Sequence, residues 1–180
     1  MRILEEKTIA LVIDIQEQLF PVMYEKESLL KNCKILIAGL VELSIPLIVT
    51  QQYTKGLGET LPEIKSHIPN FSYIEKRSFS CCDELSVVEK LTKTGAENVI
   101  ICGIESHICV MQTAVDLKEA GLNPIVVMDC VSSRTEKNIA TAKERFRYEG
   151  IMMASYESIL FELVRSSAAP EFKVISKLVK

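Results

Sequence analysis

Three residues with reactive side chains follow or end apolar segments of the sequence. Asp14 follows the apolar run 8–13, Lys76 ends the segment 72–76, and Cys109 lies shortly after the run 98–103. A thiolate is a nucleophile, a carboxylate can accept the proton of a thiol, and an ammonium group stabilises negative charge. Together the three side chains can supply the nucleophile, the base and the electrostatic activator of a covalent hydrolysis.

Each of these residues also has an ordinary interpretation. An Asp after a strand is often a helix N-cap, a single Lys is usually solvated, and a single Cys near apolar residues is often a packing residue. The joint pattern favours chemistry. A cysteine in the first turn of a helix feels the positive end of the helix dipole, and a nearby ammonium acts in the same direction. We therefore expect the pKa of Cys109 to be lowered.

Short apolar runs alternate along the chain with segments whose apolar residues recur at helical spacing. The predicted strands are 8–14, 46–50, 72–76, 98–103, 123–128 and 152–155, and the predicted helices are 27–43, 83–94, 108–120, 136–149, 157–165 and 171–178, with a loop at 51–72. Such alternation predicts a parallel sheet that is covered by helices on both faces. Sites in these folds form beyond the carboxyl ends of the strands, where the three reactive residues fall.

Composition limits the classes of protein that fit. The 180 residues are 48% hydrophobic and carry a net charge of −3, which excludes a disordered chain and fits one domain spanning 1–180. No basic cluster supports binding to nucleic acid, and no apolar run approaches the length of a membrane helix. The N-terminal residues lack the pattern of a signal peptide, so we expect a cytoplasmic protein whose cysteines are reduced.

Cysteine and histidine usage gives little support for a metal site. The chain has six cysteines and two histidines, with no C-x-x-C pair. We interpret the five cysteines other than Cys109 as packing residues. His107 lies two residues before Cys109, but residues two apart on a helix do not face each other, so we do not expect it to be the base.

Four stretches of the sequence resemble the isochorismatase-like, or cysteine hydrolase, superfamily. They are Ala10–Gln16 with its D-x-Q, Glu75–Ser80 around the lysine, Ile101–Val110 around the cysteine, and Val127–Ser133. Their order and spacing match across essentially the whole chain. The resemblance to the uncharacterised isochorismatase domain-containing branch rests on 50–58, 161–163 and 170–173.

The resemblance implies a fold, a catalytic triad and a mode of assembly. The fold is a doubly wound, three-layer α/β sandwich with a six-stranded parallel sheet in the order 3-2-1-4-5-6. The triad is Asp14, Lys76 and Cys109. A non-proline cis peptide between Ile104 and Glu105 is implied, with an oxyanion hole formed by the backbone N–H groups of Glu105 and Cys109. We further expect a homo-oligomer, and a substrate pocket that includes Gln16, Tyr53 and Phe79.

The resemblance also bears on cofactors. Nicotinamidases of this superfamily carry an Asp-x-His metal motif after the second strand, and the matching positions here are Gln52 and Thr54. Neither side chain supplies the carboxylate or imidazole that such a metal needs. We therefore expect no catalytic metal and no cofactor.

These observations favour a metal-independent cysteine hydrolase that cleaves an amide-type C–N bond of a small molecule through a thioester on Cys109. One alternative is an isochorismatase-type hydrolase of a vinyl ether, in which the acidic residue acts and Cys109 is dispensable. Another is a non-catalytic binding or scaffolding member of the family.

Overall fold

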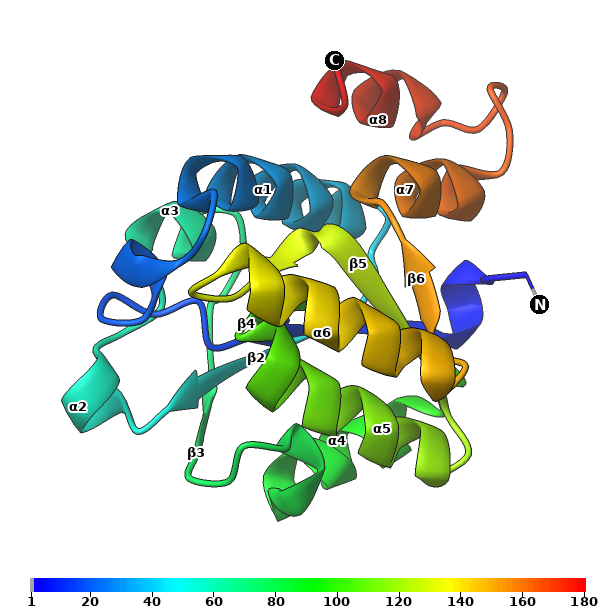
Figure 1. Cartoon of the computed structure of the whole chain (residues 1–180). Coiled ribbons are helices and arrows are strands. Elements are labelled where there is room, and N and C mark those ends of the chain that lie inside the picture. The colour runs from blue at the N-terminus through cyan, green and yellow to red at the C-terminus, as the bar shows by residue number, and fades with distance from the viewer. Residues whose placement is uncertain (1) are drawn as a thin grey trace.

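A computed structural model describes residues 2–180 and contains one six-stranded sheet (Figure 1). The strands are β1 (Thr8–Ile13), β2 (Leu47–Gln52), β3 (Ile74–Lys76), β4 (Asn98–Ile104), β5 (Asn123–Ser132) and β6 (Met152–Ala154). Their order is β3-β2-β1-β4-β5-β6, and all neighbouring pairs are parallel. The predicted doubly wound α/β fold and its strand order are confirmed.

Helices cover both faces of this sheet. They are α1 (Lys26–Glu42), α2 (Thr54–Leu57), α3 (Pro62–Lys65), α4 (Leu85–Thr94), α5 (Met111–Glu119), α6 (Glu136–Tyr148), α7 (Tyr156–Val164) and α8 (Phe172–Leu178), with shorter turns η1 (Glu5–Lys7), η2 (Phe20–Val22), η3 (Cys81–Asp83) and η4 (Ser106–Val110). Figure 1 shows α1 and α7 on one side of the sheet and α4, α5 and α6 on the other, with α8 outside α7.

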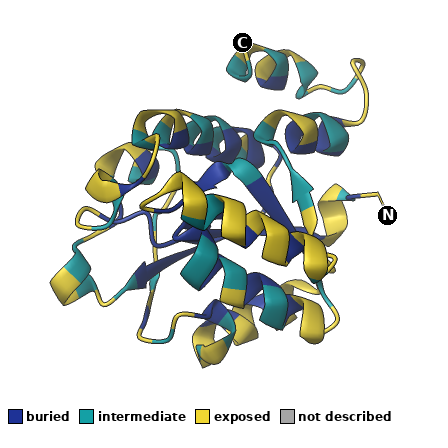
Figure 2. Ribbon diagram, in the orientation of Figure 1, coloured by how far each residue is buried: buried dark blue, intermediate teal, exposed yellow. Residues whose placement is uncertain are grey.

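The sheet separates two apolar cores. Alternate residues of β1 point to opposite faces, so Ala10 and Val12 pack with α1 and α7, whereas Ile9 and Leu11 pack with α4, α5 and α6. Every residue of β1 and β4 is buried, because helices cover both sides of the central strands (Figure 2). This double burial explains why the strands read as continuous apolar runs in the sequence.

The structure differs from the sequence prediction in three places. The segment 51–72, predicted to be a loop, contains α2 and α3; α2 follows Tyr53, whose carbonyl accepts hydrogen bonds from Gly56 and Leu57, and α3 has Pro62 in its first turn. Strand β5 continues to Ser132, four residues beyond its predicted end. The helix predicted at 108–120 begins earlier, as the π-helical turn η4. The hydrogen bonds that close α2 and α3 are local, and these helices are too short to leave a helical repeat of apolar residues in the sequence.

Gly103 brings the carboxyl ends of β1 and β4 together. It pairs with Ile13 in the sheet and has a φ of 125°. A Cβ atom at this position would lie 2.0 Å from the carbonyl oxygen of Ile13, which no side chain can accommodate. The β4–β5 register also shifts between Ile101 and Gly103. The close approach places Asp14 beside the chain that leads from β4 into η4.

Candidate active site

Asp14, Lys76 and Cys109 meet at the carboxyl edge of the sheet. Asp14 follows β1, Lys76 ends β3, and Cys109 lies in η4 directly after β4. The relative exposures of these residues are 0%, 1% and 6%, so the cluster is enclosed by protein. The strand order brings together residues that are more than thirty positions apart in the sequence.

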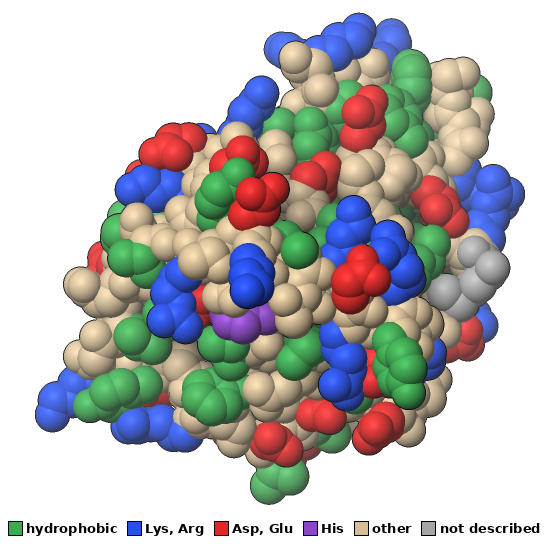
Figure 3. All heavy atoms as spheres, in the orientation of Figure 1, with side chains coloured by type: hydrophobic (Ala, Val, Ile, Leu, Met, Phe, Trp, Pro, Cys, Tyr) green, Lys and Arg blue, Asp and Glu red, His purple; other side chains and the backbone are tan. Residues whose placement is uncertain are grey.

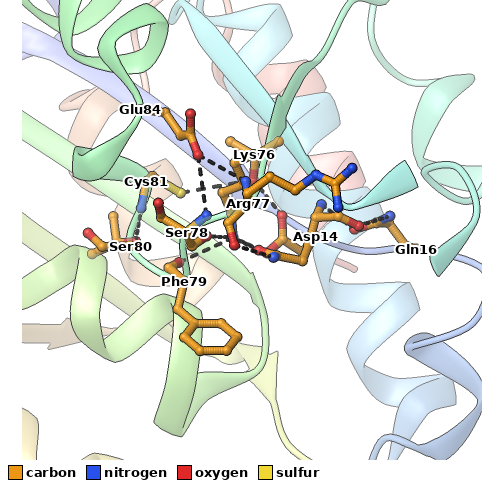
Figure 4. Close-up of polar contacts among 12 residues, drawn as sticks. Asp14, Gln16, Lys76, Arg77, Ser78, Phe79, Ser80, Cys81 and Glu84 are labelled. Carbon is orange, nitrogen blue, oxygen red and sulfur yellow. Dashed lines mark hydrogen bonds and ion pairs between the residues drawn. The ribbon is translucent and has the colours of Figure 1, made fainter. Parts of the chain in front are cut away.

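Asp14 lies at the centre of the cluster. Its Oδ2 atom is 2.7 Å from Nζ of Lys76, and its Oδ1 atom accepts a hydrogen bond of 2.7 Å from the hydroxyl of Thr50 (Figure 4). Burial raises the pKa of Asp14, while Lys76, Thr50 and the Cys109 thiol act in the opposite direction. Among residues 2–180, Oδ2 has no hydrogen-bond partner besides this ion pair with Lys76, so the carboxylate keeps capacity to accept a proton.

Lys76 is buried and held by four oxygen atoms. Besides Asp14, its Nζ atom donates to Oε1 of Gln52 at 2.7 Å and to the carbonyls of Ser78 and Phe79 at 3.1 and 3.2 Å. Burial alone lowers the pKa of Lys76, but the charge of Asp14 offsets this effect and the net shift is upward. The ordinary interpretation of a solvated lysine is therefore wrong here, and the side chain stays cationic inside the site.

The expectation that the pKa of Cys109 is lowered is wrong. Burial, together with the negative charge of Asp14, raises this pKa to about 12, and the ammonium of Lys76 only partly offsets the increase. The reason is that ionisation of Cys109 would add a second buried anion beside Asp14. The resting site therefore contains a neutral thiol.

A proton can nevertheless move inside the cluster without a change in its total charge. An ionised Asp14, a cationic Lys76 and a neutral Cys109 sum to zero, and the same sum holds after the thiol proton passes to Asp14. Only loss of that proton to solvent creates uncompensated buried charge. The geometry thus suits a thiol that is deprotonated by its neighbour during attack.

The segment after β4 is tied to the segment after β5. The Ile104–Glu105 peptide bond is cis. The Glu105 carboxylate accepts hydrogen bonds from the backbone N–H and Nε of Arg134, at 3.3 and 3.1 Å. Nδ1 of His107 is 2.9 Å from Oγ of Ser133, so the contact of this imidazole is with Ser133.

The three predicted pocket residues occupy different environments. Gln16 is fully buried, and its amide binds only backbone: Nε2 donates to the carbonyls of Gln52 and Gly58, and Oε1 accepts from the N–H of Gln52. Tyr53 and Phe79 are exposed by 38% and 55%. The N–H of Tyr53 donates to the backbone carbonyl of Lys76, and the carbonyl of Phe79 accepts from Nζ of Lys76. This arrangement favours substrate contact for the two aromatic residues and a structural role for Gln16.

The positions matching the family's metal motif have other partners. The side-chain oxygen Oε1 of Gln52 accepts a hydrogen bond from Lys76, and its Nε2 donates to the backbone carbonyl of Arg77. The Thr54 hydroxyl donates to Oε1 of Gln51. Within residues 2–180, no group of three or more His, Cys, Asp or Glu side chains is arranged to hold a metal ion.

Sequence reasoning missed two polar side chains and one thiol of the site. Thr50 and Gln52 bind Asp14 and Lys76, and Cys81, interpreted as a packing residue, lies within 4.0 Å of the Thr50 hydroxyl. The alternation of β2 could have revealed Thr50 and Gln52, since they share one face of its carboxyl end. Nothing in the local sequence distinguishes Cys81 from Cys82.

The surface in Figure 3 carries interspersed acidic and basic side chains.

Across residues 2–180, none of the helices has the length and apolar character required to cross a membrane.

The fold is a three-layer α/β sandwich, and Asp14, Lys76 and Cys109 are buried at the carboxyl edge of its sheet. A family model described as "Isochorismatase domain" matches residues 8–158, and the chain belongs to this family. It is an isochorismatase-family hydrolase. The chain is 36% identical to isochorismatase domain-containing protein 2 of Danio rerio, over 99% of this chain and 89% of the relative.

Solved structures agree with this assignment. A structure titled MAR1 ribonuclease from Caenorhabditis elegans superposes with a TM-score of 0.94 at 37% identity and covers 99% of this chain and 92% of that one. The YcaC gene product of Escherichia coli, titled an octameric hydrolase of unknown specificity, superposes with a TM-score of 0.93 at 23% identity, over 99% and 89% of the two chains. The second match supports the fold.

Proposed function

We propose that this protein is a metal-independent cysteine hydrolase that cleaves an amide-type C–N bond of a small molecule. The observation that carries the proposal is the buried ion pair of Asp14 with Lys76, inside an enclosed site where Asp14 also interacts with the thiol of Cys109. A carboxylate in this position can accept the thiol proton and later return it to a leaving amine.

In the first half of the reaction, Sγ of Cys109 attacks the carbonyl carbon of the substrate as its proton passes to Asp14. The carbonyl oxygen gains negative charge and accepts hydrogen bonds from the backbone N–H groups of Glu105 and Cys109. Lys76 stabilises the negative charge in the cluster. When the tetrahedral intermediate collapses, the C–N bond breaks and Asp14 protonates the leaving amine, which leaves a thioester on Cys109.

In the second half, Asp14 takes a proton from water, and the resulting hydroxide attacks the thioester carbonyl. The C–S bond breaks, the acid product leaves, and the proton on Asp14 returns to Cys109. Each step keeps the buried charge balanced against Lys76. The proposal needs no cofactor, which fits the amide and hydroxyl side chains of Gln52 and Thr54 at the metal-motif positions.

Substrate access favours a small molecule. Tyr53 and Phe79 are partly exposed next to the buried cluster, and the Arg77 guanidinium carbon lies 4.1 Å from the centre of the Tyr53 ring. We propose that the exposed side chains of Tyr53 and Phe79 contact the substrate near Lys76. Gln16 supports the pocket indirectly, because its hydrogen bonds to Gln52 and Gly58 hold the backbone there in place.

The names of the relatives suggest other reactions besides amide hydrolysis, and a single variant, Cys109→Ala, distinguishes between them. Cys109→Ala should abolish amide hydrolysis but spare a vinyl-ether hydrolysis that needs only the acidic residue. Because the C. elegans neighbour is titled a ribonuclease, the same variant should also be tested on RNA. The substrate panel therefore comprises small amides, carbamoyl compounds, isochorismate and an RNA oligonucleotide.

Turnover of an amide or carbamoyl compound by the wild type, with no turnover by Cys109→Ala, is the expected result. Hydrolysis of isochorismate or RNA that survives in Cys109→Ala contradicts the cysteine mechanism. Trapping of an acyl group on Cys109, detected by mass spectrometry of the quenched enzyme, gives a second readout that does not depend on the rate. No turnover and no acyl adduct with any compound favours the binding or scaffolding alternative.

We also propose that the chain forms a homo-oligomer and acts in the cytoplasm, where its six free thiols stay reduced. The E. coli neighbour is titled an octameric hydrolase, which supports association. Light scattering coupled to size-exclusion chromatography should give a mass that is a multiple of the chain mass. A mass equal to one chain at micromolar concentration contradicts this part of the proposal.

A further inference from the structure

Cys81 is a second thiol in the candidate active site for which the proposed hydrolysis has no use. It begins η3, five residues after Lys76, and its side chain is completely buried. Its Sγ atom lies 4.0 Å from the hydroxyl of Thr50, and this hydroxyl donates to Asp14. Cys81 is therefore separated from the catalytic carboxylate by a single side chain.

The backbone of Cys81 also contacts α5, the helix that directly follows the turn η4 with Cys109. Its N–H donates to the hydroxyl of Thr113 at 2.9 Å. Thr113 is four residues after Cys109 in the chain. Contacts with Thr50 on one side and Thr113 on the other place Cys81 between β2 and α5, within the core that also contains Cys109.

The remaining cysteines are less well placed to react with Cys109. Cys33, Cys102 and Cys130 belong to the core on the opposite face of the sheet, so the strands separate them from the site. Cys82 lies on the same face, but its thiol is directed to the backbone carbonyl of Thr113 at 3.9 Å. Cys81 is the thiol that shares polar neighbours with the triad.

We propose that Cys81 is a resolving cysteine and that it forms a disulfide with Cys109 after a hydroperoxide has oxidised Cys109. This inference rests on the proposed function, since it requires that Cys109 be the reactive thiol of the site. The disulfide would remove the nucleophile, and a thiol reductant would restore it. The site would thus be a reversible modification site as well as a hydrolytic one.

The chemistry balances with hydrogen peroxide as the oxidant. Sulfur of Cys109 attacks one peroxide oxygen, the O–O bond breaks, and the products are the sulfenic acid of Cys109 and one water, with the thiol proton carried to the departing oxygen. Sulfur of Cys81 then attacks the sulfenic sulfur, the S–O bond breaks, and hydroxide leaves as water with the Cys81 proton. Overall, two thiols and one peroxide yield one disulfide and two waters.

The neighbours of the two thiols assign them different roles. Burial and the charge of Asp14 raise the pKa of Cys81 to about 12, as they do for Cys109, with Lys76 and the hydroxyls of Thr113 and Thr50 acting the other way. The Cys109 thiol interacts with Asp14 directly, whereas the Thr50 hydroxyl lies between Asp14 and Cys81. Cys109 should therefore react first with peroxide, and Cys81 should react second with the sulfenic acid.

The test uses the full chain in its reduced form, treated with hydrogen peroxide, alkylated and digested for mass spectrometry. The expected product joins the peptide of Cys81 to the peptide of Cys109, and dithiothreitol should reverse it. In Cys81→Ser, no thiol at position 81 can capture the sulfenic acid. Under conditions in which the wild type forms the disulfide, peroxide should therefore oxidise at least half of Cys109 in this variant to sulfinic or sulfonic acid. The matched control Cys82→Ser keeps the same segment and should still form the disulfide.

The outcomes separate this inference from the proposed function. Alkylation of Cys109 by iodoacetamide without peroxide, measured in parallel, shows whether Cys109 is reactive at all. If Cys109 is alkylated but peroxide gives a stable sulfenic acid or a disulfide to Cys82, the resolving role of Cys81 is wrong while the hydrolytic proposal stands. If Cys109 resists both reagents, both proposals are contradicted.

Discussion

The Nζ atom of Lys76 lies 2.7 Å from Oδ2 of Asp14, and neither side chain is exposed to solvent. A buried ion pair of this kind is weak evidence for net stability, because removing two charges from water can cost more than their mutual attraction returns. Here the pair also limits what Cys109 can do. A thiol beside a balanced pair can transfer its proton to the anion, but it cannot lose the proton to solvent without leaving net charge in the interior.

Replacing Asp14 with Asn should slow alkylation of Cys109 and hydrolysis of an identified substrate by about 10²–10⁴-fold, because the proton acceptor is lost. The pH profile should change as well. In the wild type, burial raises the pKa of Asp14, so the reaction should slow as pH falls and the carboxylate becomes protonated. In Asp14→Asn this acid limb should disappear, and because the charge of Asp14 helps to raise the pKa of Cys109, the thiol should ionise at lower pH than in the wild type, where its pKa is about 12.

Iodoacetamide labelling at several pH values, followed by peptide mass spectrometry, measures both effects. Thermal unfolding of Asp14→Asn provides the control for folding. A folded variant with the wild-type rate and the wild-type acid limb contradicts the role of Asp14 as the base.

Replacing Lys76 with Met should destabilise the protein by about 3–5 kcal/mol at neutral pH, because Asp14 remains buried without its partner. The deficit should shrink as pH falls. A folded-state pKa of Asp14 that is raised above its unfolded value means that the native state binds the additional proton, so acid relieves the buried charge.

Urea unfolding at neutral and acidic pH tests this prediction. The matched control is Lys93→Met, since Lys93 forms an exposed pair with Glu89 at 3.9 Å and its loss should have little effect. Equal, small effects of the two substitutions would show that the Lys76 pair is not buried in solution.

Gln16→Ala should destabilise the protein by roughly 2–4 kcal/mol, because three hydrogen bonds to backbone groups of Gln52 and Gly58 are lost inside the protein. The exposed Gln18 two residues later supplies the control, and Gln18→Ala should be nearly neutral. The free energy of unfolding from urea titrations gives both values. A stability unchanged by Gln16→Ala, with a raised KM for an identified substrate, would favour direct contact between Gln16 and the substrate.

Gly103→Ala should cost more than about 4 kcal/mol or prevent folding, because the added Cβ would meet the carbonyl of Ile13 at 2.0 Å. Gly95 provides a matched control. It also has a positive φ, of 63°, but a Cβ atom added there would have no other atom within 4 Å, so Gly95→Ala should cost only about 1–2 kcal/mol. Circular dichroism during urea unfolding compares the variants, and similar costs would contradict the proposed close approach of β1 and β4.

Much of the fold could be predicted from the sequence because both faces of a parallel sheet are buried. The central strands then appear as apolar runs without alternation, as in β1 and β4, and the intervening helices show apolar residues at helical spacing. Local backbone geometry could be predicted less well from the sequence. The short helices α2 and α3 and the π-helical turn at Cys109 depend on individual hydrogen bonds that leave no periodic signal.

For the site, the types of the reactive residues and their order could be predicted from the sequence: a carboxylate after β1, a lysine at the end of β3 and a cysteine after β4. The ionisation of these residues and their neighbours depend on how the chain folds. Burial and the proximity of Asp14 raise the pKa of Cys109, although its helix position and Lys76 favour the opposite shift. The same packing brings Cys81 into contact with Thr50, and it places the Gln16 side chain where it hydrogen-bonds to the backbone of Gln52. Charge and solvent access depend on distances through space, and those distances arise only when the strands pair.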